Sequence, residues 1–180
     1  MINYNSHNIT GMSYNGHTIK KAYGCDGKLV WENNPCGSYM LSYNRQYGQG
    51  ETFTIPYNGR TEIPYDAVDY EKTNNIKIFN LKFGPCVNSI AAQAFQNVIA
   101  TPEELHIPSN IKSIGECAFD GNTGLTVYME SLTPPSISEH TFICHNCQGQ
   151  PTFYVPTEAV NTYKTANVWS GYASRIFPMP

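Results

Sequence analysis

Charged side chains are scarce in this chain of 180 residues. Asp, Glu, Lys and Arg make up only 14% of the sequence, against roughly 25% in an average globular protein. The formal net charge is -3 at pH 7, so the chain lacks the basic surface that a phosphate backbone attracts. The composition therefore argues against nucleic-acid binding.

Long apolar runs are missing as well. No stretch approaches the ~20 apolar residues of a membrane span, and the first ten residues contain no basic start followed by an apolar segment. We therefore expect neither membrane insertion nor a cleaved export signal. The polar surface instead falls to Asn, Ser, Thr, Gly and the 13 tyrosines, a composition that favours strands and loops.

Cysteines are few and widely separated. The chain has six, which is too few for a disulfide scaffold, and we expect most of them to be buried thiols that pack as small hydrophobic side chains. Only Cys144 and Cys147 have the spacing of a metal or redox site. Structural zinc and a local disulfide are alternatives there, but zinc needs two more ligands, and only His140 and His145 lie nearby. Loop thiols are the simplest interpretation, and we expect no cofactor.

Signatures of catalysis are also lacking. The sequence contains no G-x-S-x-G nucleophile turn and no glycine-rich phosphate loop ending in G-K-[ST]. Asp66 and Asp69 lie between Tyr65 and Tyr70, and such a carboxylate pair could act on a sugar in a small carbohydrate-active protein. A solvated loop is the simpler interpretation, so we expect a protein that is not an enzyme and has no catalytic residues.

What the sequence does contain is an internal repeat. Residues 89–95, 113–119 and 136–142 share one phrase, Ser-Ile followed four residues after the Ile by Ala or Thr and then by Phe, and the Ile positions step by 24 and 23. A short alternating apolar pattern precedes each copy, and a fourth follows the last. A period in the twenties is typical of a solenoid, in which each repeat buries its apolar side against its neighbours.

Two side-chain positions in the repeat have predictable roles. Phe95, Phe119 and Phe142 end the three copies, and we expect them to form a column in the core. The third copy has Thr141 where the others have Ala, and two prolines stand before it, so we expect its coil to be distorted.

The alternating patterns predict one outward residue in each strand. Their apolar residues lie two apart and point to one face, while the residue between them faces solvent. This outward set is Lys82, His106, Tyr128 and Tyr154, and it is our candidate binding surface. Ordinary solvent-facing positions are the alternative.

The repeats resemble a known family over residues 76–180. The best copy, Leu105-His-Ile-Pro-Ser-Asn-Ile-Lys-Ser-Ile-Gly-Glu-Cys-Ala-Phe119, is similar to the phrase L-x-I-P…V-x-S-I-G-x-x-A-F of BspA-type leucine-rich repeats. Residues 153–176 resemble the segment that closes many arrays of this family, and Thr157 fits the N-cap of a short helix there. The resemblance implies a role in recognition or adhesion at a surface.

The first third of the chain lacks the repeat. Asn15-Gly16 and Asp26-Gly27 each stand between alternating segments and predict two tight hairpins. Residues 38–43 and 51–56 predict two further strands. The phrase Lys28-Leu-Val-Trp-Glu32 resembles the β-rich lead-in of phage virion proteins, such as tail or fibre proteins of crAss-like gut phages.

Together these patterns predict a β-rich α+β fold in four parts. Residues 1–35 form an attachment segment of β-hairpins, 36–75 a β-rich connecting region, 76–152 a leucine-rich-repeat solenoid of about three repeats, and 153–180 a C-terminal helical cap.

We expect a structural or recognition component of a bacteriophage particle: a tail, fibre or capsid decoration. It would assemble in the host cytoplasm as a homo-oligomer and contact other virion proteins or a host-surface glycan or protein. The alternatives are a bacterial adhesin at the cell surface or a cytosolic interaction module.

Overall fold

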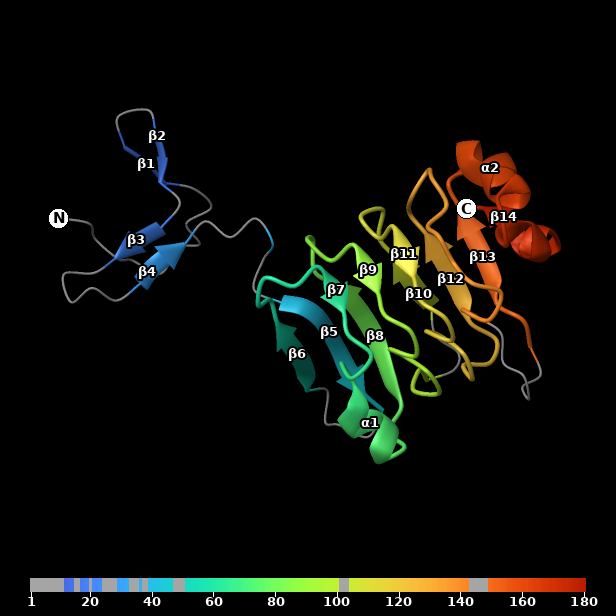
Figure 1. Ribbon diagram of the computed structural model, residues 1–180, viewed down its shortest axis with the longest axis horizontal. Helices are drawn as coiled ribbons and strands as arrows, with labels where there is room; N and C mark the ends of the chain where they lie inside the picture. Colours follow the sequence, from blue (N-terminus) through green and yellow to red (C-terminus); the bar gives the residue numbers. More distant parts are fainter. Residues whose placement is uncertain are drawn as a thin grey trace. The chain divides into compact units, whose positions relative to one another are not determined.

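Short strands dominate the structure (Figure 1). The computed structural model describes residues 12–14, 17–19, 21–23, 29–32, 36, 39–46, 51–100, 104–142 and 149–180. These residues form a β-rich α+β protein with several small sheets and few helices. The chain divides into two units, Met1–Pro35 and Cys36–Pro180.

The first unit contains two antiparallel strand pairs. Strand β1 (Met12–Tyr14) pairs with β2 (His17–Ile19), and β3 (Lys21–Tyr23) pairs with β4 (Leu29–Glu32). Tyr14 lies opposite His17 in the register, so two residues connect the first pair. Both predicted hairpins are confirmed as antiparallel pairs.

The second unit begins with an antiparallel sheet. Its central strand β5 (Tyr39–Arg45) lies between β6 (Thr52–Pro56) and β8 (Ile78–Phe83). Residues 40–44 of β5 are all buried, as expected of a central strand covered on both faces. The strands predicted at 38–43 and 51–56 are therefore confirmed as paired neighbours.

Helix α1 (Asp69–Thr73) is attached to this sheet by a buried charge. Glu71 is 2% exposed and accepts hydrogen bonds from the Tyr43 hydroxyl and from Arg45 Nε, each at 2.8 Å. The Arg45 guanidinium also lies 3.7 Å from the centre of the Phe53 ring. Burial, and then the hydrogen bond to Glu71, raises the pKa of Tyr43 to about 12, so this hydroxyl stays protonated.

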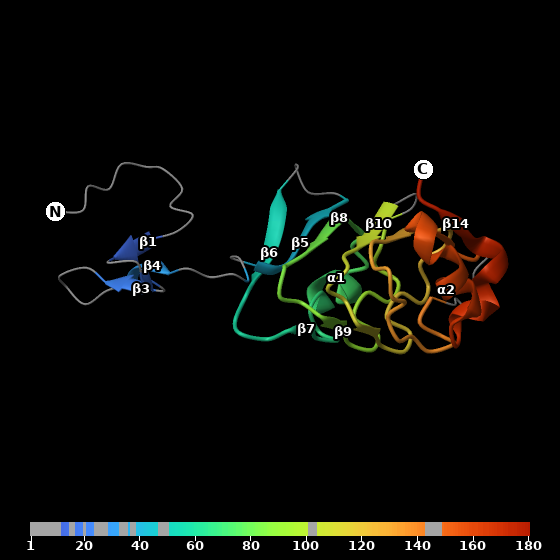
Figure 2. The same ribbon diagram turned by 90° about the horizontal axis from the view of Figure 1, so that it is seen from above.

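The second unit also contains two parallel ladders. One contains β7 (Glu62–Ile63), β9 (Ser89–Ile90) and β11 (Ser113–Ile114). The other contains, in spatial order, β10 (Glu104–Ile107), β12 (Thr126–Met129), β13 (Thr152–Val155) and β14 (Ile176–Pro178). Figure 2 shows β10 and β14 along one side of this unit and β7 and β9 along the other.

The core between the ladders contains the expected phenylalanine column. Phe95 stacks on Phe119 with ring centres 5.4 Å apart, and Phe119 stacks on Phe142 at 5.3 Å. All three rings are buried. This prediction is confirmed, because the first ladder pairs Ser89 with Ser113, and Ser113 bridges Ser136, so the three copies of the repeat lie side by side.

The third copy of the repeat keeps its place despite its polar substitution. Thr141 is fully buried, and its hydroxyl accepts a hydrogen bond from the Ser138 N–H at 2.9 Å and donates one to the Gly115 carbonyl at 3.1 Å. In this copy Ser136 forms only an isolated bridge to Ser113. The Thr141 hydroxyl therefore makes its hydrogen bonds inside the core. In its pairing the third copy differs from the others in that it is joined to its neighbour through a single bridge and not through a strand.

Helical segments follow the last repeat. They are η1 (Thr157–Ala159), α2 (Val160–Thr165) and η2 (Trp169–Arg175). Tyr163 and Trp169 are buried with ring centres 5.0 Å apart. The expected N-cap at Thr157 is wrong, because Thr157 is itself the first residue of the 3₁₀ turn and makes no capping side-chain bond. Of the described helices, none is long and apolar enough to cross a membrane.

The cysteines differ from expectation. Cys36 and Cys86 form a disulfide with a sequence separation of 50 and a Cα–Cα distance of 4.8 Å. Spacing in the sequence gives no sign of this bond, because the antiparallel pairing of β5 and β8 brings the two residues together. Cys117 is a partly buried free thiol. Cys25, Cys144 and Cys147 lie outside the described residues.

Candidate functional site

One line of ring-bearing side chains runs across the outer face of the four-stranded parallel sheet. Each strand contributes one residue: His106 from β10, Tyr128 from β12, Tyr154 from β13 and Phe177 from β14. The four strands lie side by side (Figure 1). We call these four residues the aromatic row.

Strand alternation explains why these rings face outward. His106 lies between Leu105 and Ile107, which are both 1% exposed, and the same alternation holds in β12 and β13; in β14 only Ile176, before Phe177, is buried. The parallel pairing then places Tyr128 beside His106 on one side and beside Tyr154 on the other. Phe177 continues the line because it pairs with Tyr154.

The rings of the aromatic row stack on each other. Ring centres are 4.7 Å apart for His106 and Tyr128, 5.1 Å for Tyr128 and Tyr154, and 6.1 Å for Tyr154 and Phe177. The first two pairs are nearly parallel, with interplanar angles of 6° and 18°. The rings of His106, Tyr128 and Tyr154 therefore cover each other's faces, while Phe177 is tilted by 41° to Tyr154, and the stacked part of the row presents ring edges and two tyrosine hydroxyls to solvent.

Acidic residues flank the row at its β10 end. His106 Nδ1 lies 3.6 Å from a carboxylate oxygen of Glu130, and both side chains are about half exposed. Partial desolvation, followed by the charge of Glu104, raises the pKa of Tyr128. The Tyr128 hydroxyl therefore keeps its proton at neutral pH and can donate a hydrogen bond to a partner.

The structure brings three of the four expected surface residues together. Lys82 is exposed and lies on β8, which contacts β10 but is hydrogen-bonded to β5 in the antiparallel sheet, so Lys82 is not one of the stacked rings. Phe177, 43% exposed, is the residue that sequence reasoning missed. The one signal for it in the sequence is the apolar Ile176 immediately before it, and the proline after it weakens the strand pattern.

The candidate carboxylates of a carbohydrate-active site lie on the surface near α1. Asp69 begins that helix and faces Lys72, with 3.7 Å between the charged atoms, while Asp66 lies in the exposed turn before it. Tyr65 and Tyr70 are 62% and 60% exposed. The two carboxylates thus have the surroundings of ordinary surface residues.

The weak metal candidate cannot be placed. Cys144 and Cys147 fall outside the described residues. Among the residues that the structure does describe, no group of three or more His, Cys, Asp or Glu side chains could hold a metal ion.

Comparison with known proteins adds no relative. No protein-family model matches the chain, and no curated protein matches its sequence.

Proposed function

We propose that this chain is a non-enzymatic recognition component of a bacteriophage particle, in a tail, a fibre or a capsid decoration. In this proposal residues 76–180 are a short BspA-type leucine-rich-repeat solenoid closed by the C-terminal helices. The first unit attaches the chain to the particle, and the aromatic row contacts a host-surface or virion protein.

The pairing of the repeats supports the solenoid. Ser89 pairs with Ser113, and Ser113 bridges Ser136, so one position of each repeat lies beside its counterpart in the next. The phenylalanine column has the same spacing inside the core. Repeats that bury their apolar sides only against their neighbours have this arrangement.

The observation that carries the functional proposal is the aromatic row. Tyrosines supply large, rigid contact areas with little loss of conformational entropy, and they are enriched among the residues that dominate binding energy at interfaces. Because the rings stack on each other, a partner meets edges and hydroxyls. This favours a protein partner over a sugar stacked on a ring face.

Display in many copies would make a weak contact effective. A row of only four side chains is a small interface, and an isolated chain would bind weakly. On a particle the second and later contacts become intramolecular, which raises the overall affinity by orders of magnitude. This reasoning supports a homo-oligomeric or particle-bound state.

A pair of variants tests the row. We expect Tyr128→Ser with Tyr154→Ser to weaken binding to host cell envelopes or to purified particles by about tenfold or more. The matched control is Tyr65→Ser, which removes a tyrosine that is 62% exposed and lies outside the row. Circular dichroism checks that both variants fold. Unchanged binding of the row variant, or an equal loss in the control, would contradict the proposal.

Fractionation tests the setting in a particle. Mass spectrometry of gradient-purified phage particles should find the chain together with the major virion proteins. Recovery of the chain only in the bacterial envelope fraction would favour the adhesin alternative instead.

One observation favours that alternative setting. The Cys36–Cys86 disulfide is of the kind that persists outside the cytosol. A surface adhesin would form it during export, whereas a virion protein would form it after lysis releases the particle. Thiol alkylation followed by mass spectrometry, before and after lysis, separates these two histories.

A further inference from the structure

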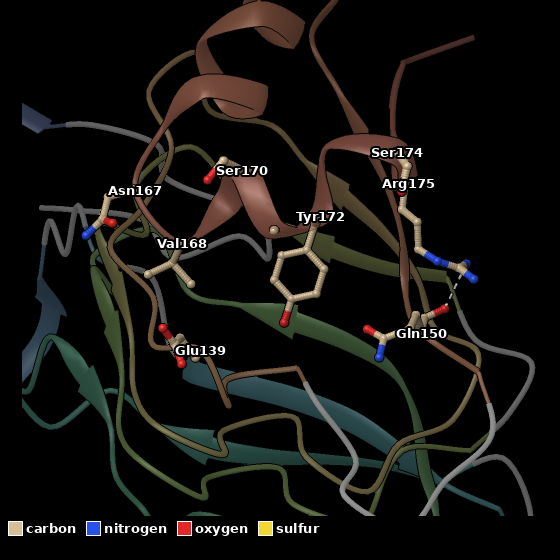
Figure 3. A pocket seen from close by; sticks show the side chains of 9 residues that line it. Glu139, Gln150, Asn167, Val168, Ser170, Tyr172, Ser174 and Arg175 are labelled. Atoms are coloured by element: carbon tan, nitrogen blue, oxygen red, sulfur yellow. Dashed lines mark hydrogen bonds between the residues drawn. The ribbon is translucent and has the colours of Figure 1, made fainter.

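A pocket lies beneath η2 (Figure 3). Its lining residues come from residues 139–175, after β10, the first strand of the aromatic row. Its volume is about 620 Å³, within the usual range for a small-molecule site. Residues of η2 and of the turn before it form one wall, and Glu139 and Gln150 lie on the opposite side.

The wall contains a strained backbone residue. Val168 has φ 65° and ψ -46°, and the Trp169 N–H donates a hydrogen bond to the Asn167 carbonyl at 2.8 Å, which closes a three-residue turn. A β-branched residue is a genuine outlier at positive φ. Such strain persists only where the surroundings hold it, and it clusters at functional sites.

Buried contacts hold this turn in place. The Trp169 side chain is 1% exposed, and its indole N–H donates to the Pro135 carbonyl at 2.8 Å. Its ring packs against Phe153 with 5.2 Å between ring centres. The strained turn is therefore fixed to the core behind the pocket, and Asn167 and Ser170 lie on the pocket wall on either side of it.

The same wall contains an unpaired hydroxyl group. Tyr172 is 6% exposed and packs against Phe153, yet its hydroxyl has no hydrogen-bond partner among the described residues. Figure 3 shows the ring pointing from η2 toward the side on which Glu139 and Gln150 lie. The hydroxyl oxygen is itself buried, whereas Glu139 and Gln150 are exposed, so a ligand has to displace neighbouring side chains to reach the hydroxyl.

The lining residues indicate the class of ligand. The amides of Gln150 and Asn167 and the hydroxyl of Ser170 mix donors with acceptors. Glu139 and Arg175 add one negative and one positive charge, which cancel. A singly charged ligand of either sign would be attracted by one of these side chains and repelled by the other, so the lining has no net preference for charge. A neutral polyhydroxylated molecule can satisfy all of these groups at once.

We propose that this pocket binds a neutral saccharide unit, one of whose hydroxyls pairs with the hydroxyl of Tyr172. The site is separate from the aromatic row and does not depend on the function proposed for that row. The chain would then bind a glycan in this pocket and a protein at the aromatic row.

The test is a titration of the full-length chain followed through the Trp169 indole resonance in NMR spectra. The probes are D-glucose, D-galactose, D-mannose and N-acetyl-D-glucosamine, with inorganic phosphate as the charged comparison. Trp31, the other of the two tryptophans, lies in the first unit and serves as an internal reference. At least one neutral sugar should shift the Trp169 resonance with saturation, and phosphate should not.

Two matched pairs of variants assign the binding. Tyr172→Phe should weaken that sugar about tenfold, the value of one lost hydrogen bond, whereas Tyr163→Phe should not. Asn167→Ala should also weaken it, whereas Asn161→Ala, an exposed change outside the pocket, should leave it unchanged.

Three outcomes would overturn the proposal. They are no shift of the Trp169 resonance with any of the four sugars, the same sugar affinity in Tyr172→Phe as in the unchanged chain, and a larger shift with phosphate than with any sugar. The double variant Tyr128→Ser with Tyr154→Ser should retain the sugar response. Loss of sugar binding in this double variant would show that the pocket is not independent of the aromatic row. Loss of protein binding in the same variant tests only the function proposed for the row.

Discussion

The two buried tyrosines of the C-terminal helices have opposite hydrogen-bonding states. Tyr163 donates to the Ser131 carbonyl at 3.0 Å, whereas the Tyr172 hydroxyl has no partner in the described part of the chain. Removing a hydroxyl that makes a buried hydrogen bond leaves the acceptor of that bond unpaired. Removing a buried hydroxyl that makes no hydrogen bond also removes the cost of its desolvation. We expect Tyr163→Phe to lower the free energy of unfolding by about 1–2 kcal/mol and Tyr172→Phe to leave it unchanged or raise it by about 1 kcal/mol. Urea denaturation measures both, and an equal loss in the two variants would mean that Tyr172 has a partner.

Asn122 stabilises two neighbouring turns of the chain at once. It is 4% exposed, its amide donates to the carbonyls of Phe95 and Phe119 at 2.8 and 2.9 Å, and its oxygen accepts from the Ile99 N–H at 2.8 Å. Asn122→Leu would leave three buried backbone groups unpaired. We expect a loss of about 3 kcal/mol in the free energy of unfolding by thermal or urea denaturation. The exposed control Asn161→Leu should change it by less than about 0.5 kcal/mol.

Phe95, Phe119 and Asn122 show which buried residues can be predicted from the sequence and which cannot. Phe95 and Phe119 could be placed in the core because an aromatic side chain at a repeated position has few other places to go. Asn122 could not, because it stands in a run of Gly, Asn and Thr that is typical of a solvated turn. Its partners, Phe95 and Ile99, come from the preceding turn of the chain, and only the packed structure reveals them.

Among the elements, the backbones of neighbouring turns of the repeat approach closely at Gly115. A Cβ atom there would lie 2.7 Å from the backbone carbon of Ala91, and closer still to Ala92. The atoms that it would meet belong to the backbone, which cannot move aside as the end of a flexible side chain could. We expect Gly115→Ala to lower the free energy of unfolding by about 1–3 kcal/mol, measured by thermal denaturation.

The control for that substitution is Gly171→Ala. A Cβ atom at Gly171 would meet nothing within 4 Å, so stability should be unchanged within about 0.5 kcal/mol. Equal stability of the two variants would mean that the turns are not packed as closely at Gly115 as described.

At the level of elements, the sequence predicted strands well where alternation was strong. Strands β10, β12 and β13 coincide with the apolar pairs of the repeat. Strand β14 was missed, because its three residues follow a helical segment and end in proline, which weakens any strand pattern. Helix α1 was missed as well, because five residues carry too little periodicity and the buried Glu71 looks like a surface residue in sequence.

For the molecule as a whole, buried tyrosines predict a loss of stability in alkali. Burial raises the pKa of Tyr43 and of Tyr172 from near 10 to about 12, and it raises that of Tyr163 further. Between about pH 10 and 12 the unfolded chain loses protons that the folded chain keeps, so unfolding is favoured as the pH rises. This stabilising contribution is fully present below about pH 10.

Tyrosinate absorbance during an alkaline titration measures this. The buried tyrosines should ionise only in a late step that coincides with loss of the circular dichroism signal. A single smooth ionisation of all tyrosines without unfolding would contradict the described burial.

The disulfide predicts how the second unit responds to reduction. The Cys36–Cys86 bond closes a loop across a sequence separation of 50, which contains β5, β6, β7, α1 and β8. Cross-linking a loop of that length reduces the entropy of the unfolded chain and stabilises the fold by about 4 kcal/mol in the chain-entropy account. The loop covers the region that the sequence analysis expected to connect two parts of the chain, and it continues to Cys86. The disulfide therefore constrains the antiparallel sheet covalently.

We expect Cys36→Ser with Cys86→Ser, or treatment with a phosphine reductant, to lower the free energy of unfolding by up to about 4 kcal/mol in urea. Cys117→Ser is the control, because that thiol is free and should respond little. If reduction leaves the unfolding midpoint unchanged, the loop is already ordered in the denatured state or the bond is not formed in solution, and alkylation of the unreduced chain distinguishes these. A large loss would instead mean that the fold depends on an oxidising setting, which is where both a released particle and a surface adhesin function.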